Sequence, residues 1–250
     1  MDNHFKIIVP LYNVEKWIQY CINSIKAQTY ENFECIIIDD ISTDNSVEKI
    51  NKIIKNDKRF KLVVNKEKKY ALKNIYDALL LCQPANDDIV VTVDGDDWLA
   101  SKDVLEKVNK IYKKQNCWMT YGSYMEFPSR KRGKFSKQIP HHIIKSNSYR
   151  KFEWCSSHLR TFKFHLWRSI NKEDFINTNT GEFIKSAWDL AFMFPMLEMS
   201  ADKAFYIKDV LYVYNRENPL NEDKVDHVAQ LTEENYIRNK KVYNQKWATR

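Results

Sequence analysis

The sequence lacks long apolar runs. None of its 250 residues lies in a stretch of about 18 uncharged apolar residues, the length that a membrane-spanning helix needs. The first predicted strand begins at once, at Phe5, in place of a secretory leader. We therefore expect neither a membrane span nor a signal peptide, and a cytoplasmic protein that is soluble or peripherally associated with a membrane.

Cysteine patterns are absent as well. The 5 cysteines are odd in number and scattered, and they form neither a CxxC pair nor a Cys/His zinc pattern. They are Cys21, Cys35, Cys82, Cys117 and Cys155. We expect reduced thiols in the core of the protein.

Glycine is missing where two common ligand-binding loops require it. A nucleotidyltransferase typically has a glycine-rich, basic loop after its first strand, where this chain has Pro10-Leu11-Tyr12-Asn13. An EF-hand calcium loop that began at Asp94 would need Gly at its sixth position and Glu at its twelfth, where the chain has Leu99 and Leu105. The calcium loop is excluded, and a nucleotidyltransferase stays a less favoured alternative.

The charge of the chain is strongly positive. A net charge of +7 suits an anionic donor molecule, an anionic lipid surface or nucleic acid, and selects none of them. The densest basic run, Arg130–Lys134, follows Pro128 and Ser129. We interpret this run as an exposed loop rather than a site for a polyanion, and we expect no nucleic-acid partner.

Apolar segments alternate with helix-periodic segments through the first half of the chain. This order predicts an α/β fold with a Rossmann-like, mostly parallel sheet flanked by helices. The predicted strands are Phe5–Val9, which Pro10 should end, Phe33–Ile38, Phe60–Val64 and Asp88–Val93. The predicted helices are Val14–Gln28, a helix that ends at Ile54 after the capping side chains of Thr43–Ser46, Tyr70–Leu81 and Ser101–Gln115.

The second half is less regular. We predict strands at Trp118–Met125, Ala204–Ile207 and Val210–Tyr214, and helices at Ser186–Met199 and from about Val225 to Asn244. Because no internal repeat and no low-complexity linker separates the two halves, we treat residues 1–250 as one domain.

An acidic cluster directly follows the apolar run Ile89–Val93. Asp94, Gly95, Asp96 and Asp97 place three carboxylates within four positions. Carboxylates this close need a cation among them, and their hard oxygen ligands suit Mg²⁺ or Mn²⁺ carrying a phosphate-bearing substrate. Asp39-Asp40 ends another strand at the same edge of the sheet, where open α/β sheets bind their ligands. The alternative is a solvated, Asp-rich turn.

Three segments together carry a resemblance to a known family. Ile7–Asn13, Ile37–Asp44 and Val93–Asp97 are similar, in this order, to the signatures of family 2 glycosyltransferases with the GT-A fold. The resemblance implies an inverting transfer of a sugar, from a nucleoside diphosphate that is usually UDP, to a hydroxyl acceptor. It implies that residues 1–117 bind the nucleotide sugar and that residues 118–250 supply the acceptor side and the catalytic base.

The resemblance assigns donor contacts to Pro10, Tyr12 and Asp40. A uracil ring needs an aromatic or backbone surface and a hydrogen-bond partner at its edge, which Tyr12 and Asp40 can supply; the alternative for Tyr12 is a core aromatic. Lys73 and Asn74 occupy the place of the family's basic residue and Asn, although the usual glycine before them is missing. The alternative for Lys73 is a solvated helix face.

In the acidic cluster, the resemblance makes Asp96 the best metal ligand. It places Asp94 on the ribose or the metal, and Asp97 on the metal directly or through water. Gly95 replaces a more frequent small polar residue, and a glycine fits a tight turn.

The family's catalytic base is an Asp at the start of a helix in the second half. Asp189, preceded by Trp188, fits this place best, and Glu182 is the reserve candidate. The alternative for Asp189 is a helix-start Asp favoured by the dipole. Because the usual acidic neighbour is replaced by Trp188, a non-catalytic module that binds nucleotide sugars or glycans also stays open.

The segment Cys155–Lys163 resembles a motif of a subset of the family. His158 and Arg160 lie two residues apart and would face the same side of an extended chain. We predict donor contacts for both, with a buried His and a surface Arg as the alternative. Trp154, Trp167 and Trp188 are either a platform for a sugar or core residues. Tyr212–Asn215 with Asn218 and Pro219 resembles the end of the domain in the same subset, and we expect it to form the wall near the acceptor.

The expected partners are a UDP-sugar, such as UDP-glucose or UDP-galactose, and a hydroxyl acceptor such as a glycan, a lipid-linked glycan or a hydroxylated protein side chain. The sequence sets neither the linkage nor the oligomeric state.

Overall fold

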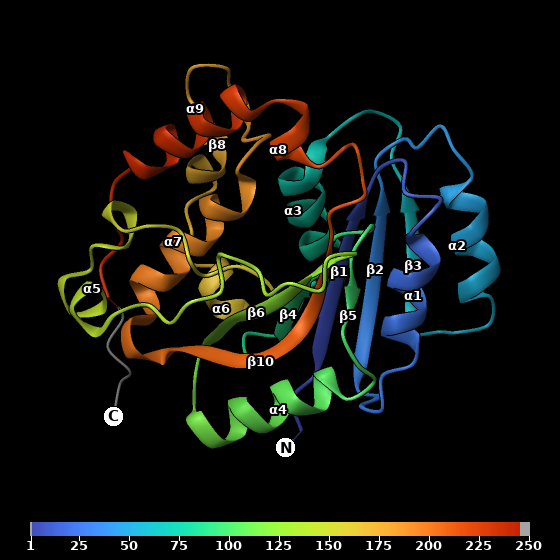
Figure 1. The fold of residues 1–250 in the computed structure, drawn as a ribbon, viewed down its shortest axis with the longest axis horizontal. Coiled ribbons are helices and arrows are strands. Elements are labelled where there is room, and N and C mark those ends of the chain that lie inside the picture. The colour runs from blue at the N-terminus through green and yellow to red at the C-terminus, as the bar shows by residue number, and fades with distance from the viewer. Residues whose placement is uncertain (1, 246–250) are drawn as a thin grey trace.

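An eight-stranded mixed sheet forms the centre of the fold (Figure 1). The computed structural model describes residues 2–245. The strands have the order β3-β2-β1-β4-β7-β6-β10-β5, so both halves of the chain contribute to one sheet. They are β1 (Phe5–Leu11), β2 (Phe33–Asp39), β3 (Phe60–Val64), β4 (Ile89–Thr92), β5 (Trp98–Leu99), β6 (Met119–Phe127), β7 (Arg160–Lys163) and β10 (Ala204–Asn215). A separate antiparallel pair joins β8 (Ile176–Asn177) to β9 (Glu182–Phe183).

Helices cover both faces of the sheet (Figure 1). One face packs on α1 (Ile18–Lys26), α2 (Ser46–Ile54) and α4 (Val104–Gln115). The other packs on α3 (Tyr70–Cys82), α5 (His141–Ser146), α6 (Phe164–Trp167), α7 (Trp188–Ser200) and α9 (His227–Arg238), which α8 (Glu222–Val225) precedes. Successive residues of β1 enter opposite cores, Ile7 on the α1 face and Ile8 on the α3 face, as the alternation of a strand requires. The predicted α/β fold is confirmed.

The parallel part of the sheet agrees with the sequence prediction. β2, β1 and β4 are mutually parallel neighbours, and β3 extends the same array. Every residue of β1 and β4 is buried, which explains their continuous apolar sequences. The carboxyl ends of β2 and β4 therefore flank the carboxyl end of β1: the N–H of Asp40 donates to Leu11, and the N–H of Gly95 donates to Pro10.

The second half differs from the prediction in three ways. β7 is inserted antiparallel between β4 and β6, and its four residues were too few to be recognised. The two strands predicted at Ala204–Ile207 and Val210–Tyr214 are one strand, β10, whose pairing with β6 shifts register between them. The terminal helix is shorter than predicted, because α9 ends at Arg238 and α8 precedes it.

A buried ion pair fixes the far end of α7. Arg150 donates to both carboxylate oxygens of Glu198, at 2.5 and 3.0 Å, and also to the carbonyl of Ile237. Glu198 in turn accepts from the N–H of Tyr243 at 2.9 Å. These bonds satisfy charges that burial would otherwise make costly, and they connect α7 to α9 and to the chain that follows it.

The described part of the chain also tests two expectations from composition. No helix among residues 2–245 combines the length and apolar character that crossing a membrane requires. All five cysteines are free; Cys82 is half-buried and the others are buried. The expected core thiols are confirmed.

Pro10 does not end the first strand, contrary to the prediction. β1 continues to Leu11, and the Pro10 carbonyl accepts from Gly95 at 3.1 Å. The N and C=O of one strand residue point to the same side, so the ring nitrogen of Pro10 faces the end of β4 and not the continuing ladder with β2. Gly95 crosses β1 so closely that an added Cβ would lie 2.5 Å from Cβ of Leu11. The expected tight turn is present, because the N–H of Asp97 donates to the Asp94 carbonyl at 2.9 Å, but the contact with Leu11 is what excludes a side chain.

Gly95→Ala should therefore destabilise the protein. We expect the free energy of unfolding to fall by about 1–3 kcal/mol, because β1 or the acidic segment must move to admit a methyl group. Thermal unfolding followed by circular dichroism measures this change. Ala100→Ser, which adds one atom at an exposed position nearby, should melt with the wild type, and an unchanged melting temperature for Gly95→Ala would contradict the close contact.

Candidate active site at the carboxyl edge of the sheet

Three carboxylates lie where the chain leaves β4. Asp94 and Asp96 are half-buried, and Asp97 is fully buried. Asp97 accepts from the Tyr212 hydroxyl and from the N–H of Asn215, both at 2.7 Å. These two bonds use both of its oxygens, so Asp97 connects the acidic segment to β10.

Asp96 has a different partner. One of its oxygens accepts from the side-chain amide of Asn218 at 2.7 Å. Asn218 follows β10, in the segment that runs along the sheet edge to α8 (Figure 1). The other carboxylate oxygen of Asp96 can bind a cation or a further hydrogen-bond donor.

Arg160 connects the acidic segment to Asp189. Its guanidinium is 2% exposed and donates to the Asp189 carboxylate at 2.5 Å. Its other terminal nitrogen lies 3.5 Å from the Asp94 carboxylate and 3.0 Å from Nδ1 of His158. The structure thus brings together four predicted site residues, and it confirms that His158 and Arg160 face the same side.

Burial controls the protonation of this cluster. It raises the pKa of Asp94 to about 7; Arg160 opposes the rise, and the charges of Asp96 and Asp189 add to it. Burial also raises the pKa of Asp189, again against the effect of Arg160, and that of Asp97, with Asp96 and Asp94 adding to the rise. We call Asp94, Asp96 and Asp97 the acidic corner. The one guanidinium of Arg160 does not balance the charges of these carboxylates and of Asp189, so the acidic corner could hold an additional cation.

Two sets of residues qualify as cation ligands. Single ligand atoms of Asp94, Asp97 and His158 lie within 4.8 Å of one another. However, both Asp97 oxygens already accept hydrogen bonds, and the guanidinium of Arg160 lies against His158. A metal ion bound between Asp97 and His158 would be repelled by the positive charge of Arg160. Asp94 and Asp96 are partly exposed, and this pair fits a hard divalent cation better.

A second polar cluster surrounds Asp40 at the end of β2. Its carboxylate accepts from the N–H groups of Lys69 and Tyr70 and from Asn65, each at 2.9 Å. Asn65 also donates to Asn74 at 2.7 Å. Burial alone would raise the pKa of Asp40, but these hydrogen bonds lower it below its ordinary value. Asp40 thus holds the start of α3 in place.

The aromatic surface at Tyr12 is occupied by a lysine. Tyr12 is 38% exposed, and Nζ of Lys68 lies 2.8 Å from its ring centroid and 3.5 Å from Asp40. Lys68 was missed by sequence reasoning, which favoured Lys73. Lys73 instead forms an ion pair with Asp77 on the same helix.

Other predicted residues have structural partners. Trp167 stacks on Phe175 at 4.7 Å in the core, and Trp154 packs on Phe194. A tryptophan platform for a sugar is therefore wrong for these residues. Glu182, the reserve base, lies in β9, where it is exposed and forms an ion pair with Lys185 at 2.5 Å.

The segment after β10 contains two residues whose contacts with the site the sequence analysis did not predict. These are Asn218, on Asp96, and Glu222, which accepts from the N–H of Ala187 at 3.1 Å, two residues before Asp189. Burial raises the pKa of Glu222 to about 8, and the charge of Asp189 adds to the rise. No periodicity marks them, because Asn218 lies in irregular chain after β10 and Glu222 begins α8, a helix of four residues.

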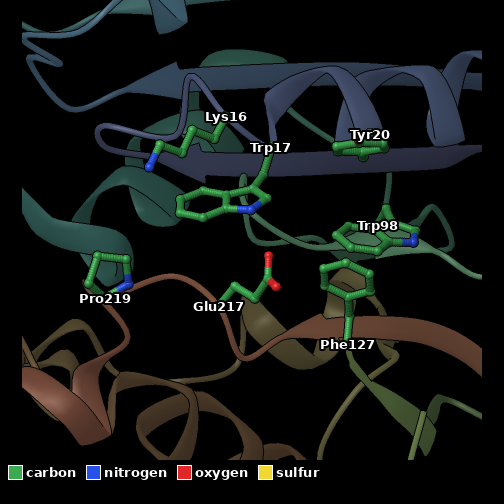
Figure 2. A pocket seen from close by; sticks show the side chains of 7 residues that line it. All are labelled: Lys16, Trp17, Tyr20, Trp98, Phe127, Glu217 and Pro219. Carbon is green, nitrogen blue, oxygen red and sulfur yellow. The ribbon is translucent and has the colours of Figure 1, made fainter. Parts of the chain in front are cut away.

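An aromatic groove of about 660 Å³ lies beside the acidic segment (Figure 2). Tyr20 packs on Trp98 with centroids 5.5 Å apart, and Trp98 packs on Phe127 at 5.3 Å. Figure 2 shows Glu217 pointing toward Trp17 from the opposite wall. The ring contacts join α1, β5 and β6. Pro219, from the segment expected near the acceptor, lines this groove, and none of the residues predicted to bind the donor or the metal does.

Two of the relatives match about half of the chain. An uncharacterized glycosyltransferase of Haemophilus influenzae is 39% identical over 120 residues, 47% of this chain and 46% of the relative. An Escherichia coli protein, UDP-Glc:alpha-D-GlcNAc-diphosphoundecaprenol beta-1,3-glucosyltransferase WfgD, is 36% identical over 126 residues, 50% of this chain and 47% of the relative. The chain thus spans about half the length of these relatives.

Solved structures share the fold. S. aureus TarS 1–349 in complex with UDP-GlcNAc superposes with a TM-score of 0.65 at 21% identity, covering 86% of this chain and 59% of the TarS 1–349 chain. The mannosyltransferase PcManGT of Pyrobaculum calidifontis, in complex with GDP-Man and Mn²⁺, has a TM-score of 0.57 at 19% identity and covers 86% of this chain and 57% of its own.

The family assignment follows from the match to a family model, which covers more than half of the chain. The model of glycosyl transferase family 2 matches residues 6–188, from β1 to the first residue of α7. This match contains the three segments on which the resemblance was based and the acidic corner described above. The chain belongs to glycosyl transferase family 2.

Proposed function

We propose that the protein is an inverting glycosyltransferase that moves a hexose from a UDP-sugar, such as UDP-glucose or UDP-galactose, to a hydroxyl acceptor. One observation carries the proposal: buried carboxylates at the sheet edge outnumber the one guanidinium among them, and Asp189 lies on the far side of that guanidinium. A corner of this kind suits a cation and a diphosphate next to a base.

Asp94 and Asp96 are the proposed ligands of Mn²⁺ or Mg²⁺. The Mn²⁺ in the PcManGT complex supports a divalent cation in this fold. When bound, the cation supplies Lewis-acid stabilisation of the charge on the leaving diphosphate. Asp97 contributes indirectly, because its bonds to Tyr212 and Asn215 hold the acidic segment in place.

The nucleoside is proposed to bind between β1 and the start of α3. Pro10 and Gly95 form the backbone floor, Tyr12 offers a ring, and Asp40 with Asn74 lies at the end of β2. Lys68 lies on Tyr12 and next to Asp40, so it would contact or be displaced by a base that enters. The TarS complexes with UDP-GlcNAc and with UDP support a uridine donor.

Asp189 is the proposed general base. As the acceptor oxygen bonds to the anomeric carbon, its proton moves to the Asp189 carboxylate, and the bond from that carbon to the diphosphate breaks, with its electron pair leaving on UDP. Arg160 holds the carboxylate by a 2.5 Å hydrogen bond and opposes the rise in its pKa. Arg160 and His158 thus act on the base and on Asp94, in addition to any contact with the donor.

The acceptor is proposed to be a carbohydrate hydroxyl, free or lipid-linked. WfgD, as its name states, acts on GlcNAc carried by diphosphoundecaprenol. An acceptor of that kind would bring the protein to a membrane surface, and the net charge of +7 suits anionic lipids. A hydroxylated protein side chain is the remaining proposal.

Asp189→Asn should abolish turnover and preserve binding. With Mn²⁺ and UDP-glucose, UDP-galactose or UDP-GlcNAc, the wild type should release UDP to water, and the variant should release it at least about 100-fold more slowly, because the base is lost. Calorimetry should give both proteins the same affinity for UDP with Mn²⁺. Asp202→Asn, at the exposed end of α7, should behave as the wild type. Near-normal release of UDP by Asp189→Asn would refute the assignment of Asp189 as the base. No release of UDP by the wild type would favour a binding module.

Asp96→Ala should weaken UDP binding by at least about 10-fold when Mn²⁺ is present, since one cation ligand is removed. Without metal, the affinity of variant and wild type should be equal. Asp87→Ala is the matched control, because its side chain is 83% exposed at the opposite end of β4. Equal Mn²⁺-dependent binding by Asp96→Ala and the wild type would remove Asp96 from the metal site.

The thermal stability of the metal-free protein should fall as the pH rises. The raised pKa of Asp94, about 7, means that folding favours its protonated form. The stabilisation is complete below the ordinary carboxyl pKa and is lost as the pH rises through about 7. Melting temperatures at pH 6 and pH 8.5 should show this loss, and Asp94→Asn should reduce it. A melting temperature that rises over this range by the same amount in both proteins would contradict it.

A further inference from the structure

The helix that carries Asp189 begins without a capping side chain of its own. α7 starts at Trp188, and its N-cap residue is Ala187, whose φ is 48°. The first N–H groups of a helix have no partner within it and need acceptors from elsewhere. Within the first turn, the Asp189 carboxylate accepts from the N–H of Leu190 at 3.1 Å, whereas the N-cap residue depends on groups outside the helix.

Two carboxylates from later in the chain bind the segment that leads into α7. Glu222 accepts from the N–H of Ala187 at 3.1 Å and from the Ser186 hydroxyl at 3.3 Å. Glu233 accepts from the N–H groups of Lys185 and Ser186 at 2.9 and 2.8 Å. Glu233 thus holds the two residues before the N-cap of α7, and Glu222 binds the N-cap residue, Ala187.

Glu222 lies at the end of a short segment that starts in the acidic corner. We call Asn215–Glu222 the strap. The N–H of Asn215 binds Asp97, and the side chain of Asn218 binds Asp96, both at 2.7 Å. Inside the strap, the Asn221 side chain donates to the Asn215 carbonyl at 2.8 Å.

Two further hydrogen bonds fix the conformation of the strap at its centre. The N–H of Leu220 donates to the Asn218 side chain at 2.9 Å, and the N–H of Glu217 donates to the Asn215 side chain at 3.0 Å. Side-chain bonds of this kind give irregular chain a fixed conformation. The strap therefore transmits the position of the acidic corner to the start of α7.

We propose that Glu222 is a positioning residue for Asp189: by binding Ala187 and Ser186 it holds the first turn of α7, and thus the base, in register with the acidic corner. This inference rests on the proposed function. Burial raises the pKa of Glu222 to about 8, and the nearby charge of Asp189 adds to the rise, which places the two carboxyls close together. A neutral Glu222 still offers an acceptor oxygen, so Gln should replace it.

Glu222→Ala and Glu222→Gln test the proposal. In the alanine variant, the amide of Ala187 should exchange with deuterium about 10-fold or more faster, and kcat for UDP release should fall about 10- to 100-fold, because the base is displaced. The KM for the sugar nucleotide and the affinity for UDP with Mn²⁺ should stay within twofold, which also shows that the variant is folded. Glu222→Gln should restore slow exchange and most of kcat.

Glu217→Ala is the matched control, because it removes an exposed carboxylate from the same strap on the side of the groove (Figure 2). It should leave the exchange of Ala187 and kcat unchanged. Wild-type kcat and exchange in Glu222→Ala, or equal losses in the Ala and Gln variants, would overturn the proposal. If the wild type released UDP from no donor, the proposed function would fail, and the exchange of Ala187 alone would decide whether Glu222 holds α7.

Discussion

Everything at the site depends on negative charge that the fold buries at one end of its sheet. Asp94, Asp96 and Asp97 leave β4 together, and one guanidinium, that of Arg160, lies among them. Desolvation raises the pKa of each carboxyl, and such a cluster is stable only when protons, hydrogen bonds or a cation compensate it. This imbalance of charge is the basis for the proposed divalent cation at the acidic corner.

The three carboxylates have separate tasks because their surroundings differ. Asp97 is fully buried and uses both oxygens to attach the corner to β10. Asp94 and Asp96 keep partial access to solvent, so they can exchange protons for a cation. Arg160 extends the network to the carboxylate of Asp189, and the strap reaches the same helix through Glu222. The acidic corner and Asp189 are therefore connected in two ways, one through Arg160 in β7 and one through the strap.

The sequence predicted the part of the site that regular structure creates. Asp40 and Asp94 follow buried parallel strands. The apolar runs and the alternation of strands therefore predict that both residues lie beside the end of β1. Asp189 was placed at a helix start by resemblance and periodicity, and the structure has it there. The contacts of Glu222 and Asn218 escaped prediction because the irregular chain between β10 and α8 is placed by long-range bonds, those of these two residues to Ala187 and Asp96. Lys68 was missed for the same reason. β7 has only four residues, and its sequence gives no sign that it pairs antiparallel between β4 and β6.

The most direct test of this account is the position of a bound cation. Crystals grown with MnCl₂ and UDP and measured at the manganese absorption edge should show an anomalous peak between the carboxylates of Asp94 and Asp96, with the diphosphate next to it. A peak between Asp97 and His158 would assign the metal to the other ligand set. No peak at this edge of the sheet, with UDP bound elsewhere, would contradict the claim that the buried charge exists to bind a cation.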